Sequence, residues 1–110
     1  MQPGANVSAP YKKLGAWLSR AYNTIYQAVS DGFVIGFHDL GNTDAGALVL
    51  DTDGSTPPTT TRTKSATTDS DSYLNMAYNF CAPVRKGDYW EVTKTGTMSN
   101  VTIWWIPLEP

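Results

Sequence analysis

The residues of this chain that are able to perform chemistry are few and lie far apart. His38 is the only histidine and is followed by Asp39, and Cys81 is the only cysteine. A nucleophile needs a base beside it and a third group that orients the base, and no Gly-x-Ser-x-Gly motif marks such an arrangement. We therefore interpret His38 as a histidine at a strand end and Cys81 as a buried structural thiol before Pro83. The sequence predicts no catalytic residue, and we expect a protein that is not an enzyme.

Alternate carboxylates precede a glycine in the segment Asp51-Thr52-Asp53-Gly54-Ser55, as they do at the start of calcium-binding loops. A complete loop of that kind needs further acceptors and a glutamate several positions later, and Pro57-Pro58 interrupts the pattern. We expect a polar turn without metal here, with calcium at Asp51 and Asp53 as the alternative. The sequence predicts no other cofactor.

The composition is that of one small folded domain with few charges. The 110 residues are 41% hydrophobic and 12% aromatic, which is enough for a packed core. Only 16% are charged, so part of the surface is expected to be covered by partner subunits. The net charge of −2 and the scattered basic residues argue against nucleic-acid binding. No apolar run is long enough to span a membrane and the N-terminus does not resemble a secretory signal peptide, so we expect no membrane insertion.

The hydrophobic residues alternate with a period of two from Thr24 onward, which predicts strands separated by turns. Asp31-Gly32 predicts a hairpin turn, Lys86-Gly87-Asp88 a turn with glycine at positive φ, and Thr59 to Lys64 an exposed edge strand. About eight short strands without a long helix predict an all-β fold, an antiparallel β-sandwich that is jelly-roll-like. The strand with the cleanest alternation is expected to turn these side chains to the core: Leu74, Met76, Tyr78 and Phe80.

The N-terminal part of the chain does not share this period. Residues 1–10 contain two prolines and a glycine, which is typical of an extended arm. Tyr11 to Tyr22 has apolar residues at helical spacing, so a short helix is one expectation and an irregular coil held by Trp17 is the other. We expect residues 1–23 to form an arm or stalk-proximal linker and residues 24–110 to form the sandwich.

The last strand, Val101 to Ile106, is apolar on both faces. Val101, Ile103 and Trp105 form one face, and the other consists of Thr102, Trp104 and Ile106. A strand of this kind needs cover on both sides. Either it lies centrally with a loop folded over it, or its outer face meets another subunit. We expect the second arrangement, with Trp104 and Ile106 in a homotrimer interface.

Three segments carry a resemblance to a known class of domain: Asp31-Gly32-Phe33-Val34, Pro83 to Trp90, and Val101 to Leu108. They resemble the C-terminal jelly-roll knobs, similar to tumour necrosis factor, that end phage tail fibres or tailspikes. The resemblance covers about residues 24–110. It implies a homotrimeric knob located in the virion, or otherwise extracellular, which trimerises and contacts a host cell-surface glycan or protein.

Binding to a host receptor would be expected of loops held on a rigid scaffold. The polar loops His38 to Ala45 and Ser65 to Ser72 supply five candidate contacts: Asp39, Asn42, Asp44, Asp69 and Asp71. The alternative function is a monomeric carbohydrate-binding module of a larger or secreted protein. Such a module shares the sandwich and its aromatic residues but needs no contact between subunits.

Overall fold

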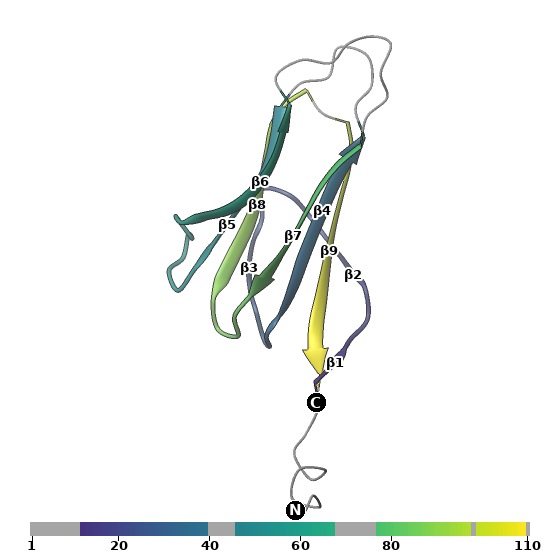
Figure 1. Cartoon of the computed structure of the whole chain (residues 1–110). Helices are drawn as coiled ribbons and strands as arrows, with labels where there is room; N and C mark the ends of the chain where they lie inside the picture. Colours follow the sequence, from purple (N-terminus) through teal and green to yellow (C-terminus); the bar gives the residue numbers. More distant parts are fainter. Residues whose placement is uncertain (1–11, 40–45, 68–76, 98, 110) are drawn as a thin grey trace, which may run out of the picture.

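The computed structural model describes residues 12–39, 46–67, 77–97 and 99–109 (Figure 1). Within these residues the chain forms nine strands and no helix. The strands are β1 (Lys13–Leu14), β2 (Leu18–Arg20), β3 (Ile25–Gln27), β4 (Gly32–Asp39), β5 (Gly46–Asp53), β6 (Thr61–Thr67), β7 (Ala77–Val84), β8 (Tyr89–Gly96) and β9 (Ser99–Glu109). The described part of the chain contains no helix that is long and apolar enough to cross a membrane. The predicted all-β antiparallel sandwich is confirmed.

The strands pair as one long antiparallel ribbon that turns back on itself between β5 and β6. β5 pairs with β6, β4 with β7, β3 with β8, and β2 with β9. The ribbon is rolled up because β4 also pairs with β9 and β5 also pairs with β8. Two sheets result, with the orders β2-β9-β4-β7 and β3-β8-β5-β6, and β1 pairs with the end of β9 beside β2. This is the strand order of a jelly roll. We call the sheet that contains β9 the first sheet and the other the second sheet.

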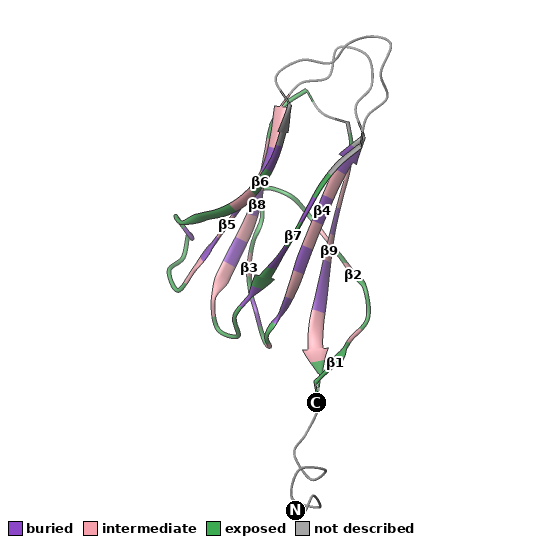
Figure 2. Ribbon diagram, in the orientation of Figure 1, coloured by how far each residue is buried: buried purple, intermediate pink, exposed green. Residues whose placement is uncertain are grey.

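The core lies between the two sheets and is built from alternate residues of each strand (Figure 2). Trp90 of the second sheet is 1% exposed and stacks on Tyr26 at 4.7 Å and on Trp105 of the first sheet at 5.9 Å, measured between ring centroids. This aromatic stack joins the sheets. The other core residues are Ala28, Val34, Leu48, Leu50, Phe80, Ala82, Val84, Val92 and Ile103. Ile106 is also buried, but on the outer face of the first sheet.

The inward face predicted for β7 is confirmed where the structure describes it. Phe80 is buried, and the same face continues with Ala82 and Val84. Phe80 lies opposite Gly36 of β4, where an added Cβ would come within 2.6 Å of the phenyl ring. The ring therefore fills the space that a side chain at this position would need. Two further residues predicted to face the core, Leu74 and Met76, and the side chain of a third, Tyr78, lie outside the described residues.

The N-terminal segment forms edge strands, so the helix predicted within residues 11–22 is wrong. Lys13 of β1 pairs with Glu109, and Leu18 of β2 pairs with Trp105. The backbone of this segment hydrogen-bonds to β9 and not to itself. Irregular chain, the other expectation, is found at residues 12, 15–17 and 21–22, and Trp17 lies in it. The first sheet thus begins before residue 24, where the sandwich was expected to start.

The hairpin predicted at Asp31-Gly32 is wrong, because β3 and β4 belong to different sheets. The connection between them crosses the end of the sandwich. Asp31 fastens it to the turn between β7 and β8 by accepting a hydrogen bond from the backbone N–H of Lys86 at 2.8 Å. In that turn the prediction is confirmed, since Gly87 adopts a φ of 89°, which favours glycine. The N–H of Gly87 also donates to the carbonyl of Ala28 at 2.8 Å.

Candidate binding surfaces

The strand ends that carry the two predicted receptor loops lie at one end of the sandwich, which we call the loop end (Figure 1). The last residue of β4, Asp39, pairs with Ser99 and Ala77, and the first residue of β5, Gly46, pairs with Thr67. β1 and the C-terminal end of β9 pair at the opposite end. Rolling of the ribbon therefore brings together the attachment points of loops that are far apart in the sequence.

Of the five predicted receptor contacts, the structure describes the backbone of Asp39 alone, at the end of β4. Its side chain lies outside the described residues. Asn42, Asp44, Asp69 and Asp71 lie outside them as well. The register of the strands places only the residues that flank the two loops at one end, and the individual contacts stay predictions.

The outer face of the first sheet is apolar. Phe33 and Ile35 of β4 lie half-buried on this face, as does Trp104 of β9. The segment between β1 and β2 runs along the β9 edge of this sheet, where the N–H of Gly15 donates to the carbonyl of Pro107 at 2.7 Å. The ring of Trp17 lies edge-on against Trp104, with 6.0 Å between the centroids. β9 is thus covered by its own chain, and the cover is itself apolar.

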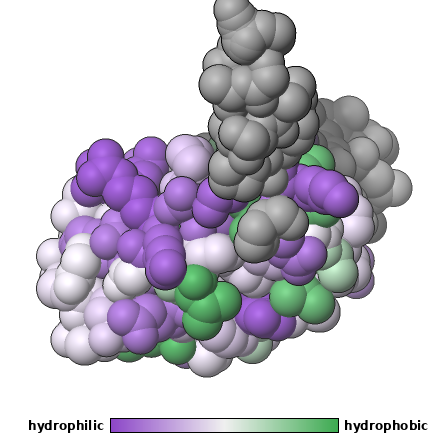
Figure 3. Space-filling model, turned by 90° about the horizontal axis from the view of Figure 1, so that it is seen from below, coloured by the Kyte–Doolittle hydropathy of each residue, from purple (hydrophilic) through white to green (hydrophobic). Residues whose placement is uncertain are grey.

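The covering residues remain open to solvent. Leu14 is 67% exposed and Trp17 is 60% exposed. They surround a hollow of about 290 Å³, and we call its lining residues the outer apolar patch: Leu14, Trp17, Phe33, Ile35, Cys81 and Ile106. Exposed apolar residues that adjoin one another on one face are candidates for contact with a partner. By contrast, the surface seen in Figure 3, from the end opposite the loop end, is mostly hydrophilic or neutral, with separate hydrophobic groups.

The predicted trimer residues and the cysteine lie on this side of the sheet. Trp104 is half-buried against Trp17, and Ile106 is only 5% exposed within its own chain. A partner would therefore meet Leu14 and Trp17 first. Cys81 is exposed, so the expectation of a buried thiol is wrong. The alternation of β7 already carried that signal, because inward Phe80 places its neighbour on the outer face.

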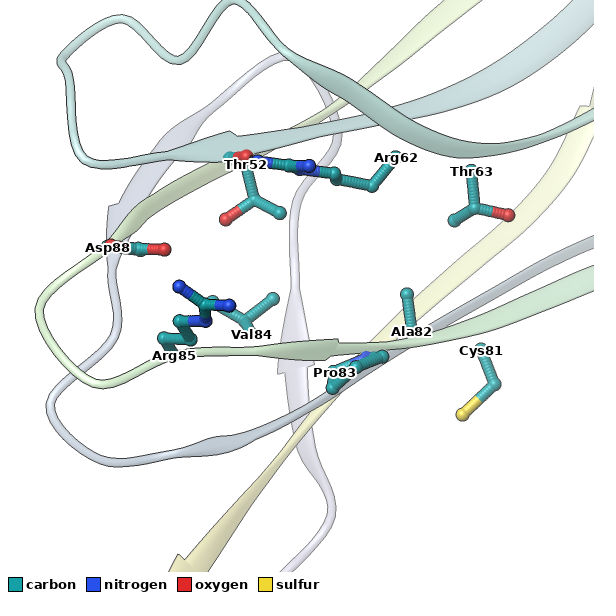
Figure 4. Close-up of a pocket in the computed structure, with 9 residues that line it drawn as sticks. All are labelled: Thr52, Arg62, Thr63, Cys81, Ala82, Pro83, Val84, Arg85 and Asp88. Atoms are coloured by element: carbon teal, nitrogen blue, oxygen red, sulfur yellow. Dashed lines mark hydrogen bonds between the residues drawn. The ribbon is translucent and has the colours of Figure 1, made fainter.

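A cleft of about 500 Å³ opens between β6 and β7, the edge strands of the two sheets (Figure 4). β6 confirms the edge strand predicted at Thr59 to Lys64, although it extends from Thr61 to Thr67. The residues of the cleft that bear polar groups are Thr52, Arg62, Thr63, Arg85 and Asp88. Cys81 touches the cleft but its sulfur points away from it in Figure 4. Sequence reasoning missed this site because no local motif joins strands β5, β6 and β7.

Hydrogen bonds fix one side of the cleft. The Nε of Arg62 donates to the carbonyl of Thr52 at 3.2 Å, and the hydroxyl of Thr52 donates to the carbonyl of Tyr89 at 2.8 Å. Figure 4 shows the guanidinium group of Arg85 pointing toward Thr52 from the turn after β7, with the carboxylate of Asp88 beside it. Within the described residues neither guanidinium group takes part in an ion pair. The guanidinium groups of Arg62, in β6, and of Arg85, in the turn after β7, therefore both line the cleft.

The carboxylate of Asp53 organises the connection between β5 and β6. It accepts hydrogen bonds from the Ser55 hydroxyl at 2.6 Å and from the backbone N–H groups of Ser55, Thr59 and Thr60 at 2.9 Å each. These bonds, the Ser55 hydroxyl above all, hold the pKa of Asp53 well below its usual range. Asp51 accepts a hydrogen bond from the hydroxyl of Thr61 at 2.7 Å. Both carboxylates predicted as alternative calcium ligands thus bind donors of their own chain, and the described residues contain no group of three or more potential metal-binding side chains.

Substituting Asp53→Asn is expected to lower the thermal unfolding temperature and to expose the connection to proteolysis, because the amide offers one acceptor oxygen in place of two. The pKa of Asp53 is lower in the folded state, so its contribution to stability is present above the ordinary aspartate value of about 3.9 and is lost as the pH falls below it. The unfolding temperature of the variant should consequently differ from that of the unmodified chain at neutral pH and converge with it in acid. An equal difference at every pH would contradict this role.

No protein-family model, curated protein or solved structure matches this chain. The outer apolar patch, the loop end and the cleft are therefore the features of the molecule that bear on its function.

Proposed function

We propose that the protein is a non-catalytic knob at the tip of a phage tail fibre or tailspike, which forms a homotrimer and contacts a host-surface receptor or glycan. The observation that carries this proposal is the outer apolar patch, with Leu14 and Trp17 more than half exposed on a sheet face. The jelly roll is the fold that the sequence resemblance implied. The partner of the patch, in this proposal, is the same patch on two further copies of the chain.

Burial of the patch supplies the free energy for assembly. Covering a side chain such as Leu14 or Trp17 contributes on the order of 2 kcal/mol, and three copies multiply that gain. A stable interface between subunits buries more than about 1,000 Å² in total, so the contact would extend over the sheet face around the patch. Closed three-fold symmetry uses each copy once and so forms no filament. The low content of charged residues, 16%, agrees with a surface that is partly covered.

The position of the N-terminal segment relative to the loop end agrees with a knob at the tip of a fibre. β1 and the end of β9 lie at the end of the sandwich opposite the loop end. A stalk that precedes Lys13 would therefore join the sandwich away from the loops. In a trimer with parallel subunits the three loop ends would point together toward the host cell.

Cys81 provides a direct test, because it is the only cysteine and lines the outer apolar patch. In a trimer formed through this patch we expect its thiol to react with a maleimide reagent roughly tenfold or more slowly than an exposed thiol, since the core of an interface excludes solvent. The control is Val29→Cys in a Cys81→Ser background, because Val29 is 80% exposed outside the patch. Equal labelling rates of the two thiols would overturn trimerisation through this face.

The receptor part of the proposal predicts that the loop end carries binding to host cells. Alanine replacement of Asp39, Asn42, Asp44, Asp69 and Asp71 together should abolish binding of the labelled knob to host cells while its oligomeric mass is unchanged. The matched control replaces polar residues at the opposite end, the half-buried Ser30 and the exposed Lys86. Binding that survives the five replacements would reject the loop end as the contact surface.

The second candidate function is the monomeric carbohydrate-binding module, and the cleft between β6 and β7 is the observation that favours it. Its volume lies in the range of small-ligand sites, about 300 to 1,000 Å³. A module of this kind would remain a monomer at micromolar concentration. The oligomeric state of the unmodified chain therefore separates the two candidates.

A further inference from the structure

We infer that the cleft between β6 and β7 is a binding site for an acidic sugar, with the sugar carboxylate held between Arg62 and Arg85. This site lies away from the loop end and adjoins the outer apolar patch, with which it shares Cys81. Its polar lining comes from described residues, and the site is present in a monomer and in a trimer alike.

The two guanidinium groups supply the anion-binding part. Arginine presents a rigid planar fork of N–H donors that matches a carboxylate in two parallel hydrogen bonds. The bond from Nε of Arg62 to the carbonyl of Thr52 orients this fork and leaves its terminal N–H groups available. Arg85 approaches the same space from the turn after β7 (Figure 4). Because neither group has an ion-pair partner within the described residues, an anion entering the cleft displaces no internal partner.

The remaining groups favour a sugar over a simple anion. Asp88 places a carboxylate in the same cleft, where it weakens binding of an inorganic anion but accepts hydrogen bonds from sugar hydroxyls. Thr63 adds a hydroxyl that both donates and accepts. Ala82, Pro83 and Val84 line the cleft with apolar surface that the C–H groups of a sugar ring can contact. The combination of two cations, one carboxylate and an apolar wall fits a ring that bears a carboxylate and several hydroxyls.

The probe for this inference is D-glucuronate, with D-glucose as the same ring without the carboxylate and acetate as the carboxylate without the ring. We expect glucuronate to shift the backbone amide resonances of Thr52, Arg62, Thr63 and Arg85 in spectra of the ¹⁵N-labelled full chain. Arg85→Ala and Arg62→Ala should each weaken this binding roughly tenfold, because a charge-assisted bidentate contact is lost. The spectra themselves report whether each variant is folded.

Two further variants distinguish specific binding in the cleft from non-specific attraction of an anion to nearby positive charges. Lys86→Ala removes one positive charge next to Arg85 but outside the cleft, and it should leave glucuronate binding unchanged within about twofold. Asp88→Ala should weaken glucuronate binding and strengthen acetate binding, because it removes both the hydroxyl acceptor and the competing negative charge. The inference is overturned if glucose or acetate binds as well as glucuronate. It is also overturned if Lys86→Ala has as large an effect as Arg85→Ala, or if glucuronate shifts no resonance at all.

Discussion

Replacement of Trp17 or Ile35 by lysine is expected to convert a trimer of this chain into folded monomers. Both side chains belong to the outer apolar patch, and neither is buried within its own subunit. The single chain therefore tolerates a lysine there, whose charged end can reach solvent. Loss of about 2 kcal/mol of burial in each subunit amounts to about 6 kcal/mol per trimer, or about four orders of magnitude in its association constant. Repulsion between three lysines near the symmetry axis adds to this effect.

The matched control is Val29→Lys, because Val29 is 80% exposed in the connection between β3 and β4 and lies outside the patch. Size-exclusion chromatography with light scattering gives the mass of each variant, and circular dichroism reports its fold. We expect the control to keep the mass of the unmodified chain. If Trp17→Lys and Ile35→Lys keep it as well, the subunits do not meet at this face.

The substitution with the largest expected effect on the stability of the fold is Trp90→Ala. Trp90 is 1% exposed and stacks between Tyr26 and Trp105, so its removal opens a cavity at the point where the two sheets touch. Truncation of a buried tryptophan costs about 3 to 5 kcal/mol. A small domain has a total stability of only about 5 to 15 kcal/mol, so the variant should lose a large fraction of its stability.

Urea unfolding followed by circular dichroism measures this loss as a lower midpoint. The control is Tyr22→Ala, since Tyr22 is 42% exposed and its ring lies under the ammonium group of Lys94 at the surface. We expect little change in that variant. A Trp90→Ala chain with the midpoint of the unmodified protein would mean that the aromatic stack does not hold the sheets together.

The alternation of inward and outward residues along each strand could be predicted from the sequence. Trp90 and Val92 on one face of β8, and Phe80 on the inner face of β7, follow from the period of two alone. The same rule places Cys81 outward, where the general tendency of free cysteines to be buried led to the wrong expectation. The pattern within a strand was therefore a better guide to exposure than the residue type.

The sequence does not indicate which distant segments pair. This accounts for the wrong predictions of an N-terminal helix and of a hairpin at Asp31-Gly32. Leu14, Trp17 and Leu18 have helical spacing, but their segment becomes an edge strand because β9 offers it unpaired backbone groups. Asp31-Gly32 has the chemistry of a hairpin turn, yet local residue types do not determine whether the flanking strands pair. The cleft was hidden for the same reason. Arg62 and Arg85 meet only after the ribbon is rolled.

The mass of the unmodified chain in solution tests the central claim most directly. One chain has a mass of 12.0 kDa, so sedimentation equilibrium at micromolar concentration should give about three times that value, about 36 kDa. A single species of 12.0 kDa under the same conditions would contradict the knob and favour the monomeric carbohydrate-binding module.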